Sequence, residues 1–521
     1  MPFINKIVAS VFIILFFVQC NSVKRYNEHL QELVTVQQLH SDIDYTYKKL
    51  QQLHPNLYGY VDKKTLDFKF DSLKKTITIP LKPVDFYKKL SPIVASVHQG
   101  HTQLYGPTVA FTKKETKELL KKGRGPLSQF EFDYIDNKLY VTKNKSSNKS
   151  VLAGTEVLAI NDINPSDLIA QYTNYYSSDG YNTTFKKLQA AKRFPGFFTI
   201  ENGIKDSLEY QFKYKDSIYS TIIRRAEADT TKKEKTKIVK TENQKENLKI
   251  FKKKKKTNGY NEEDKNFNRN LDFMQQDSSV ALMKIRKFTN GNYKRFYKQS
   301  FKSLQDHKTK TLILDLRNNG GGRLSEITYL YTYLSKTNFR FLQKTEVVSS
   351  KSLLKGAYWN GGSIPVKILK TIFAPFAYTY LLLTVHKDDK GKNYYTTETR
   401  QRSLKNNVFK GDIYVLINGG SFSASSLLSS NLKGSNRATF VGEETGGAYN
   451  GTVAGFMPVY RLPNSHLKIR IGIMNMKPYY LTTIDGYGIF PDQEIDPTLE
   501  DLLTGRDPEL EWILEDTKND N

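Results

Sequence analysis

Residues 414–426 read YVLINGGSFSASS, and this stretch decides the fold of the chain. Its first four residues are apolar and strand-like, the glycines break the strand, and leucines follow at helical spacing over 427–432. A strand that turns sharply into a helix places a serine hydroxyl at the positive end of that helix, with the next backbone N–H free to hold an oxyanion. The pattern therefore indicates a nucleophile, although serine is also a common N-cap residue.

A second stretch, TLILDLRNNGGG at 311–322, reads as a buried strand that ends in Asp, Arg, Asn and three glycines. A glycine run after a strand lets the backbone approach a ligand closely and expose its N–H groups. The stretch lacks the Gly-Lys-Ser/Thr ending of a phosphate-binding P-loop and the glycine spacing of a dinucleotide site. A backbone that binds an oxyanion is the better interpretation.

Together the two motifs resemble those of the C-terminal processing, or tail-specific, peptidases, which carry Asp-x-Arg-x-Asn-x-Gly-Gly and then Gly-Ser-x-Ser-Ala-Ser. Two more stretches of the family type follow in order, VGEETGG at 441–447 and DGYGIFPD at 485–492. The resemblance covers residues 311–492. It implies an α/β serine peptidase core with the crotonase/ClpP-like spiral of βα units, and it requires no metal and no cofactor.

The resemblance also assigns the nucleophile and its oxyanion donors. In the family pattern the nucleophile is the serine directly before alanine, which is Ser423 here, and Ser421 and Ser425 are the alternatives. The oxyanion would be held by the backbone N–H groups of Gly321 and Ala424.

The general base departs from the commonest family pattern. Many members place a lysine after a Thr-x-Gly stretch, but residues 445–448 read TGGA. A branch that resembles the tricorn protease core takes a histidine from an N-terminal segment instead, and VHQGHT at 97–102 resembles its Gly-His-Thr stretch. This places the base on His101, with His98 as the alternative, and an imidazole with a pKa near 6.5 suits that role.

A third group must orient the histidine and stabilise the imidazolium. In the tricorn-like pattern a glutamate stands two residues before the Gly–hydrophobic pair that leads to Pro-Asp, and Asp485 occupies that place here. Its shorter side chain is expected to need a bridging water. Asp485 also precedes a glycine, as ordinary turn residues do, and Glu443 is the alternative acid.

The N-terminus predicts export. The apolar run IVASVFIILFFV at 7–18 is short for a membrane span and is typical of a signal peptide, which we place at 1–19. Cys20, the only cysteine of the chain, follows directly and resembles the lipidated residue of a bacterial lipobox, although Gln19 is unusual there. We expect a lipid anchor at Cys20 in the cell envelope, periplasmic or outer-membrane associated, with a plain secretory signal as the alternative. Internal disulfides and cysteine-based metal sites are excluded.

The length of 521 residues predicts about three domains in a multidomain α+β fold. Residues 20–125 read as a helical N-terminal region, with one helix at 84–97 just before His101. Residues 126–225 alternate like strands, and LAGTEVLAINDI at 152–163 resembles the hairpin of PDZ domains. Such a module would bind substrate tails as an added edge strand, and a β-rich spacer is the alternative.

Residues 226–270 read as a basic low-complexity linker, because 229–269 carries 14 Lys/Arg against 7 Asp/Glu. Basic runs can bind nucleic acid or anionic lipid, but the net charge of +26 is spread over the whole chain. For an exported protein we expect no nucleic-acid partner.

The peptidase core is predicted at 271–507, with an insertion at about 335–410 and an acidic tail at 508–521. Residues 368–385 of the insertion are rich in Phe, Tyr and Leu. We expect them to be buried as a helical cap, with a partner surface or a membrane-facing helix as alternatives.

These observations predict an exported serine endopeptidase or C-terminal processing peptidase that cleaves polypeptides through a Ser/His/Asp acyl-enzyme. Two other functions fit the same residues. One is a catalytically silent homologue that binds peptides or glycans, and the other is a serine hydrolase of non-peptide esters or amides, since site geometry alone does not name a substrate.

Overall fold

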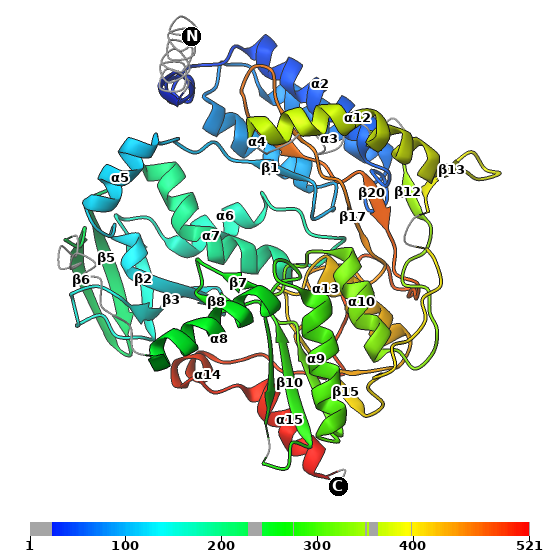
Figure 1. Ribbon diagram of the computed structural model, residues 1–521. Helices are drawn as coiled ribbons and strands as arrows, with labels where there is room; N and C mark the ends of the chain where they lie inside the picture. The colour runs from blue at the N-terminus through cyan, green and yellow to red at the C-terminus, as the bar shows by residue number, and fades with distance from the viewer. Residues whose placement is uncertain are drawn as a thin grey trace, which may run out of the picture.

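The computed structural model of the chain describes residues 23–227, 242–274, 276–349, 352–353, 363–396 and 399–519. The predicted signal peptide at 1–19 and the predicted lipidation site at Cys20 lie outside the described residues. The described chain is a mixed α+β fold, as the sequence predicts, in which helices and five sheets alternate along the chain (Figure 1).

The centre of the C-terminal half is a six-stranded sheet with the order β21-β16-β15-β11-β10-β9. Its parallel strands are β10 (Val280–Ile285), β11 (Thr311–Asp315), β15 (Asp412–Ile417), β16 (Thr439–Gly442) and β21 (Gln493–Glu494), and the antiparallel edge strand is β9 (Arg269–Phe273). Every residue of β11 is buried, because a parallel strand is covered by other elements on both faces.

Helices cover both faces of this sheet. One face packs with α9 (Tyr293–Asp306), α10 (Leu324–Leu334) and α13 (Ala424–Gly434) in the main hydrophobic core. The other face packs on α15 (Pro508–Asn519), whose Ile513 is fully buried. Residues 508–519 of the predicted acidic tail form this helix, whose apolar residues complete the second core, while Glu509 is buried and pairs with Arg317.

The N-terminal region contains α2 (Val36–Leu53), α3 (Lys63–Thr76), α4 (Pro83–Ala95) and α5 (Lys113–Lys121). Its strand β1 (Gln103–Tyr105) pairs antiparallel with β19 (Lys468–Arg470), which in turn pairs with β18 (Val459–Arg461). These pairings join the start of the described chain to the peptidase core. The turn between α4 and β1, which carries His101, is thereby fixed on that core.

Residues 130–224 form a β-rich module. An antiparallel sheet has the order β2 (Phe130–Ile135), β3 (Lys138–Asn144), β4 (Thr155–Ile160), β5 (Ser207–Tyr214) and β6 (Ser217–Arg224). The helices α6 (Pro165–Thr173) and α7 (Thr184–Asn202) interrupt the strands, and β2 lies at one edge of the sheet. A sheet with a free edge and two helices is the arrangement that a PDZ-like module requires, and the PDZ assignment stays a prediction.

The basic segment predicted as a linker contains regular structure in its described part. Helix α8 (Glu242–Asn258) includes the five consecutive lysines, and the short strands β7 (Tyr260–Asn261) and β8 (Asn266–Phe267) follow it. The aromatic ring of Phe251 on α8 packs against the rings of Tyr260 and Phe267. These few aromatic contacts, which net charge and composition do not reveal, place α8 on the protein.

The insertion forms a second sheet with a helix. Strands β12 (Thr345–Val347), β13 (Val385–Lys387) and β14 (Asn393–Tyr395) join β20 (Met474–Met476) and β17 (Thr452–Ala454) in the order β13-β14-β12-β20-β17. Helix α12 (Ile364–Thr384) is present, as expected, but the expectation that it is buried is wrong. Only Ala374 and Leu381 of this helix are buried, and most of the other side chains are exposed.

Candidate active site

Ser423 occupies a sharp turn between a strand and a helix. Strand β15 ends at Ile417, α13 begins at Ala424, and Ser423 between them has φ 60° and ψ −116°. Such angles are strained for a residue with a side chain, and they persist only where neighbouring structure holds them. The Asn418 carboxamide supplies part of that support, because its Oδ1 accepts the backbone N–H groups of Asn318 and Gly420 and so joins the two glycine-rich loops.

His101 reaches this serine from a distant part of the sequence. Its Nε2 lies 2.9 Å from Oγ of Ser423, although 322 positions separate the two residues. The pairing of β1 with β19 sets the register, and Arg470 of β19 donates from Nε to the His101 carbonyl oxygen at 3.0 Å. The ring of Phe422 lies 5.1 Å from the imidazole, centroid to centroid, and limits its movement.

The alternative residues have other partners. His98 directs its Nδ1 to the carbonyl oxygen of Gly180, 3.0 Å away. Ser421 and Ser425 are fully buried, and their hydroxyls donate to the carbonyl oxygens of Leu316 at 2.8 Å and Asn319 at 2.7 Å. Of the candidate nucleophiles and bases, the structure therefore brings together Ser423 and His101.

Both predicted oxyanion donors lie at the nucleophile. Gly321 has φ +96°, and a Cβ added there would come within 2.8 Å of Ala424 N and 2.9 Å of Ser423 Cβ. The N–H of Gly321 donates to Oδ1 of Asn319 at 3.0 Å, so this donor is already engaged in the described state. Ala424 is the first residue of α13, where a backbone N–H has no intrahelical acceptor.

Burial controls the charge of His101. The side chain is 9% exposed, and burial together with the nearby positive charge of Arg470 lowers its pKa to about 3. The imidazole is therefore neutral at pH 7 and free to accept the serine proton. Its Nδ1 is buried and, among the described residues, has no hydrogen-bond partner. A neutral histidine with such a low pKa is a weak base until a carboxylate stabilises its charged form.

The predicted acids are bonded to other groups. Asp485 accepts from Nδ2 of Asn450 at 3.1 Å and from the N–H of Gly486 at 2.9 Å, and it lines a cavity of about 60 Å³ with Gln99. Glu443 accepts the N–H of Gly419 at 2.9 Å. Neither acid contacts His101 directly in the described part of the chain.

Sequence reasoning missed Asp179. Its Oδ1 accepts the N–H of Gly100, the residue before His101, at 2.8 Å, and Oδ2 has no partner among the described residues. Burial raises the pKa of this carboxyl to about 7, with the Gly100 hydrogen bond opposing the shift. The local sequence SSDG at 177–180 reads as an ordinary turn. Only the long-range contact marks Asp179 as part of the site.

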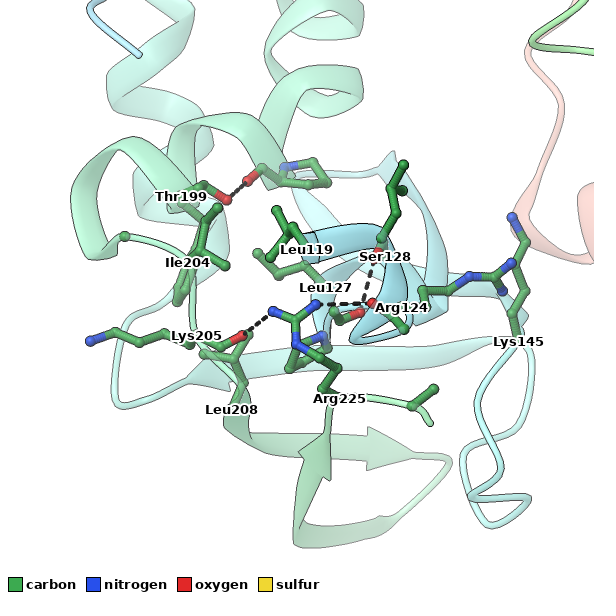
Figure 2. Close-up of a pocket in the computed structure, with 18 of the residues that line it drawn as sticks. Leu119, Arg124, Leu127, Ser128, Lys145, Thr199, Ile204, Lys205, Leu208 and Arg225 are labelled. Carbon is green, nitrogen blue, oxygen red and sulfur yellow. Dashed lines mark hydrogen bonds between the residues drawn. The ribbon is translucent and has the colours of Figure 1, made fainter. Parts of the chain in front are cut away.

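A second concave site lies on the β-rich module (Figure 2). Its cavity of about 900 Å³ is bounded by the loop 123–128, the C-terminal part of α7, and the start of β5. Leu127, Phe198 and Leu208 contribute apolar side chains, while Lys145 and Arg225 contribute positive charge. Arg225 is held in place because its guanidinium donates to the carbonyl oxygen of Gly123 at 3.1 Å.

A groove of about 1100 Å³ lies between the edge strand β2 and α7. Pro195 lines both this groove and the 900 Å³ cavity, and the groove extends to Arg317 and Asn318 of the peptidase core. The N-terminus of α7 is tied to the core, since the Thr184 hydroxyl donates to the Glu444 carbonyl oxygen at 3.3 Å. The module thus lies against the core along the groove. Among the described residues, no cluster of three or more His, Cys, Asp or Glu side chains could hold a metal.

Comparisons with known proteins place this site in a family. The model of peptidase family S41 matches residues 279–495, which contain both glycine-rich loops and Ser423. No curated protein sequence matches the chain. Solved structures of CPAF resemble the described fold: mature CPAF has a TM-score of 0.57 and 13% identity over 90% of this chain and 94% of that chain. The complex of mature CPAF with lactacystin has a TM-score of 0.57 and 12% identity, and it covers 90% of this chain and 95% of that chain. A point mutant of CPAF has a TM-score of 0.59 and 13% identity, and it covers 90% of this chain and 94% of that chain.

At 12–13% identity these likenesses establish a shared fold and nothing more. The family match is independent of them, and it covers the residues that form the strand-to-helix turn, the two glycine-rich loops and the parallel sheet. Residues 279–495 match peptidase family S41, which includes the C-terminal processing peptidases, and the chain is a serine peptidase.

Proposed function

We propose that the chain is an exported peptidase that selects polypeptides by their C-terminal tails and cleaves them with Ser423 as nucleophile and His101 as base. The observation that carries the proposal is the 2.9 Å approach of His101 Nε2 to Ser423 Oγ across 322 positions of sequence. A serine on a strained turn, with a neutral imidazole on its hydroxyl, is the arrangement that acyl transfer requires.

Each step follows from this geometry. The Ser423 hydroxyl attacks the peptide carbonyl while His101 Nε2 takes its proton. The oxyanion that forms lies before the Ala424 N–H and, once Asn319 Oδ1 releases it, the Gly321 N–H. His101 then returns the proton to the leaving amine, and water attacks the acyl-enzyme with His101 again as base.

Two carboxylates are candidates for the acid that supports His101. Asp485 occupies the family position for this acid, and the cavity of about 60 Å³ that it shares with Gln99 has room for a water, although His101 is not among the residues that line it. Asp179 is the rival, because it is hydrogen-bonded to the residue before His101 and has a free carboxylate oxygen among the described residues. A carboxylate linked to Nδ1 would raise the low pKa of His101 towards the useful range.

Tail selection rests on the β-rich module. A substrate strand added to the free edge of β2 would run along the groove towards the core, as peptides do in PDZ-like recognition. Its last side chain would enter the cavity lined by Leu127, Phe198 and Leu208, and its carboxylate would meet Arg124 and the backbone of the glycine-rich loop at 123–128.

Matched peptides test this function. A peptide that ends in an apolar residue with a free carboxylate should be cleaved with a KM about tenfold or more below that of its C-terminal amide, because a charge-assisted hydrogen bond is lost in the amide. The variant Leu127→Glu should erase the difference, while Ile218→Ser, an exposed residue of β6 outside the cavity, should keep it. Equal cleavage of acid and amide by the unmodified chain would refute tail selection and leave the serine chemistry standing.

We place the chain in the cell envelope, held by a lipid on Cys20 after removal of residues 1–19. The support is the apolar run at 7–18 followed by the sole cysteine. One acyl-modified residue would tether a folded domain without spanning the bilayer. Radiolabelled palmitate should enter the wild-type chain and not a Cys20→Ala variant, and absence of label in both would leave a secretory signal only.

A further inference from the structure

Helix α12 has an unusual orientation on the protein surface. Its less exposed positions are 370, 374, 377, 378, 381 and 384, which repeat every three or four residues and therefore form one stripe along the helix. Ala374 and Leu381 in this stripe are buried, and Tyr378 packs against the main core. The helix lies along the body of the protein on this side.

The opposite side is apolar and faces outward. Ile368, Leu369, Ile372, Phe373, Phe376 and Leu383 are all exposed, and they fall within an arc of about 140° at 3.6 residues per turn. Phe376 is 73% and Leu383 is 70% exposed. Surface helices of soluble domains show the reverse pattern, with the apolar stripe on the core. An arc of six large apolar side chains requires a partner that covers it.

The charges around the arc favour lipid as that partner. Helix α12 itself contains Lys367 and Lys370 and no acidic residue, while Lys387 of β13 is followed by Asp388 and Asp389. An apolar helix face on a helix that carries basic and no acidic residues is the pattern of helices that lie in the interface of an anionic bilayer. In Figure 1 the described chain begins at the top of the view, the side on which α12 also lies. The segment at 1–22, with its apolar run and Cys20, precedes that point.

The connections of α12 favour a helix that lies on the membrane over one that crosses it. By length and composition alone, α12 is the one helix of the described residues that could span a bilayer. However, it continues at Val385 directly into β13, which is held by β14 and through it by β12 of the peptidase domain. The buried stripe also keeps the middle of the helix on the protein.

We infer that α12 is a membrane-docking helix, whose outward apolar face inserts into the interfacial region of a bilayer with anionic phospholipids. The helix would orient the peptidase on the membrane and hold it there together with the proposed anchor at Cys20. The inference rests on residues of α12 and is independent of the proposed chemistry at Ser423, so that failure of one leaves the other intact.

Vesicle flotation tests this directly. The chain from Val23 onward contains every described element of the fold and lacks the signal and anchor residues. It should float with vesicles of phosphatidylethanolamine and phosphatidylglycerol. The pair Ile372→Ser and Phe376→Ser should lower the partition coefficient about 100-fold, because burying either side chain contributes a factor of about ten or more. The matched pair Ile218→Ser and Ile222→Ser removes two exposed apolar residues from β6 and should change nothing.

A second measurement tests the inference independently, in case the double variant does not fold. The variant Phe376→Trp should show fluorescence emission that shifts to the blue when vesicles are added, while Ile222→Trp should show no such shift. Absence of binding by the unmodified chain, or equal binding by the α12 pair, would overturn the inference. So would light scattering that shows a dimer without vesicles and a monomer for the α12 pair, since this would assign the arc to a second copy of the chain.

Discussion

Two adjacent glycines offer a sharp test of the active-site geometry. A Cβ at Gly321 would lie 2.8 Å from Ala424 N and 2.9 Å from Ser423 Cβ, whereas ordinary contacts begin near 3.4 Å. Gly321→Ala must therefore displace the nucleophile or the oxyanion loop by about half an ångström, and it also places a side chain at φ +96°. A Cβ at Gly320 meets nothing within 4 Å, so Gly320→Ala is the matched control.

The expected effect is catalytic. Loss of one oxyanion donor typically lowers kcat by about 10²–10³-fold, and Gly321→Ala should fall in this range with little change in KM. Gly320→Ala should stay within about threefold of wild type. The assay is cleavage of a fluorogenic peptide, with circular dichroism to confirm that both variants fold. Similar rates for the two variants would show that Gly321 does not lie against Ser423, and the description of the oxyanion site would be refuted.

Three further results follow from the structure. Asp485→Asn should lower kcat by about 100-fold or more, because Asp485 is proposed to support His101, whereas Asp179→Asn should lower kcat by less than about tenfold. The reverse order of the two kcat values would assign the role to Asp179. His101 binds its proton near pH 3 when folded and near pH 6.5 when unfolded, so the unfolded state binds more protons and stability falls as pH falls. Between pH 6.5 and 4.5 the free energy of unfolding, measured with urea, should fall by about 2 kcal/mol more for the wild type than for His101→Gln. Equal decreases in the two proteins would contradict the burial of the imidazole. Arg317→Ala should reduce the free energy of unfolding by about 3 kcal/mol or more, because the two terminal guanidinium nitrogens donate to Asp507 and the guanidinium also pairs with the buried Asp315. The control is Lys302→Ala, which removes an exposed ion pair with Asp306 within one helix. Equal urea midpoints for the two variants would contradict this prediction.

The sequence predicts the catalytic core well, because its signals are local. The motif that contains Ser423 and the motif that contains Asp315 each consist of one strand and the turn that follows it, and the structure reproduces both. The serine peptidase assignment follows from the order of these motifs, which the family match confirms.

Contacts between distant segments are harder to predict. Asp179 lies in a turn that looks ordinary, and only its bond to Gly100 shows its relation to His101. The resemblance assigns the Gly321 N–H as an oxyanion donor, and in the structure this N–H donates to the Asn319 side chain two residues away. Whether a side chain folds back on its own loop depends on local geometry that residue type does not reveal.

The orientation of α12 is a further feature that the sequence does not determine. A run of apolar residues is consistent with burial, with a partner surface and with membrane contact, and the sequence favoured burial. The face that packs is determined by the sheet to which the helix is attached. Hydrophobic composition therefore predicted a helix at 368–385, close to the observed α12, but not its orientation.

The central claim is that His101 activates Ser423, and labelling with a fluorophosphonate probe tests it most directly. The folded chain should be labelled, and the label should be lost in Ser423→Ala and in His101→Ala but kept in His98→Ala, whose imidazole points to the Gly180 carbonyl. Labelling that survives in Ser423→Ala or His101→Ala, or a wild-type chain that takes up no label, would contradict the account.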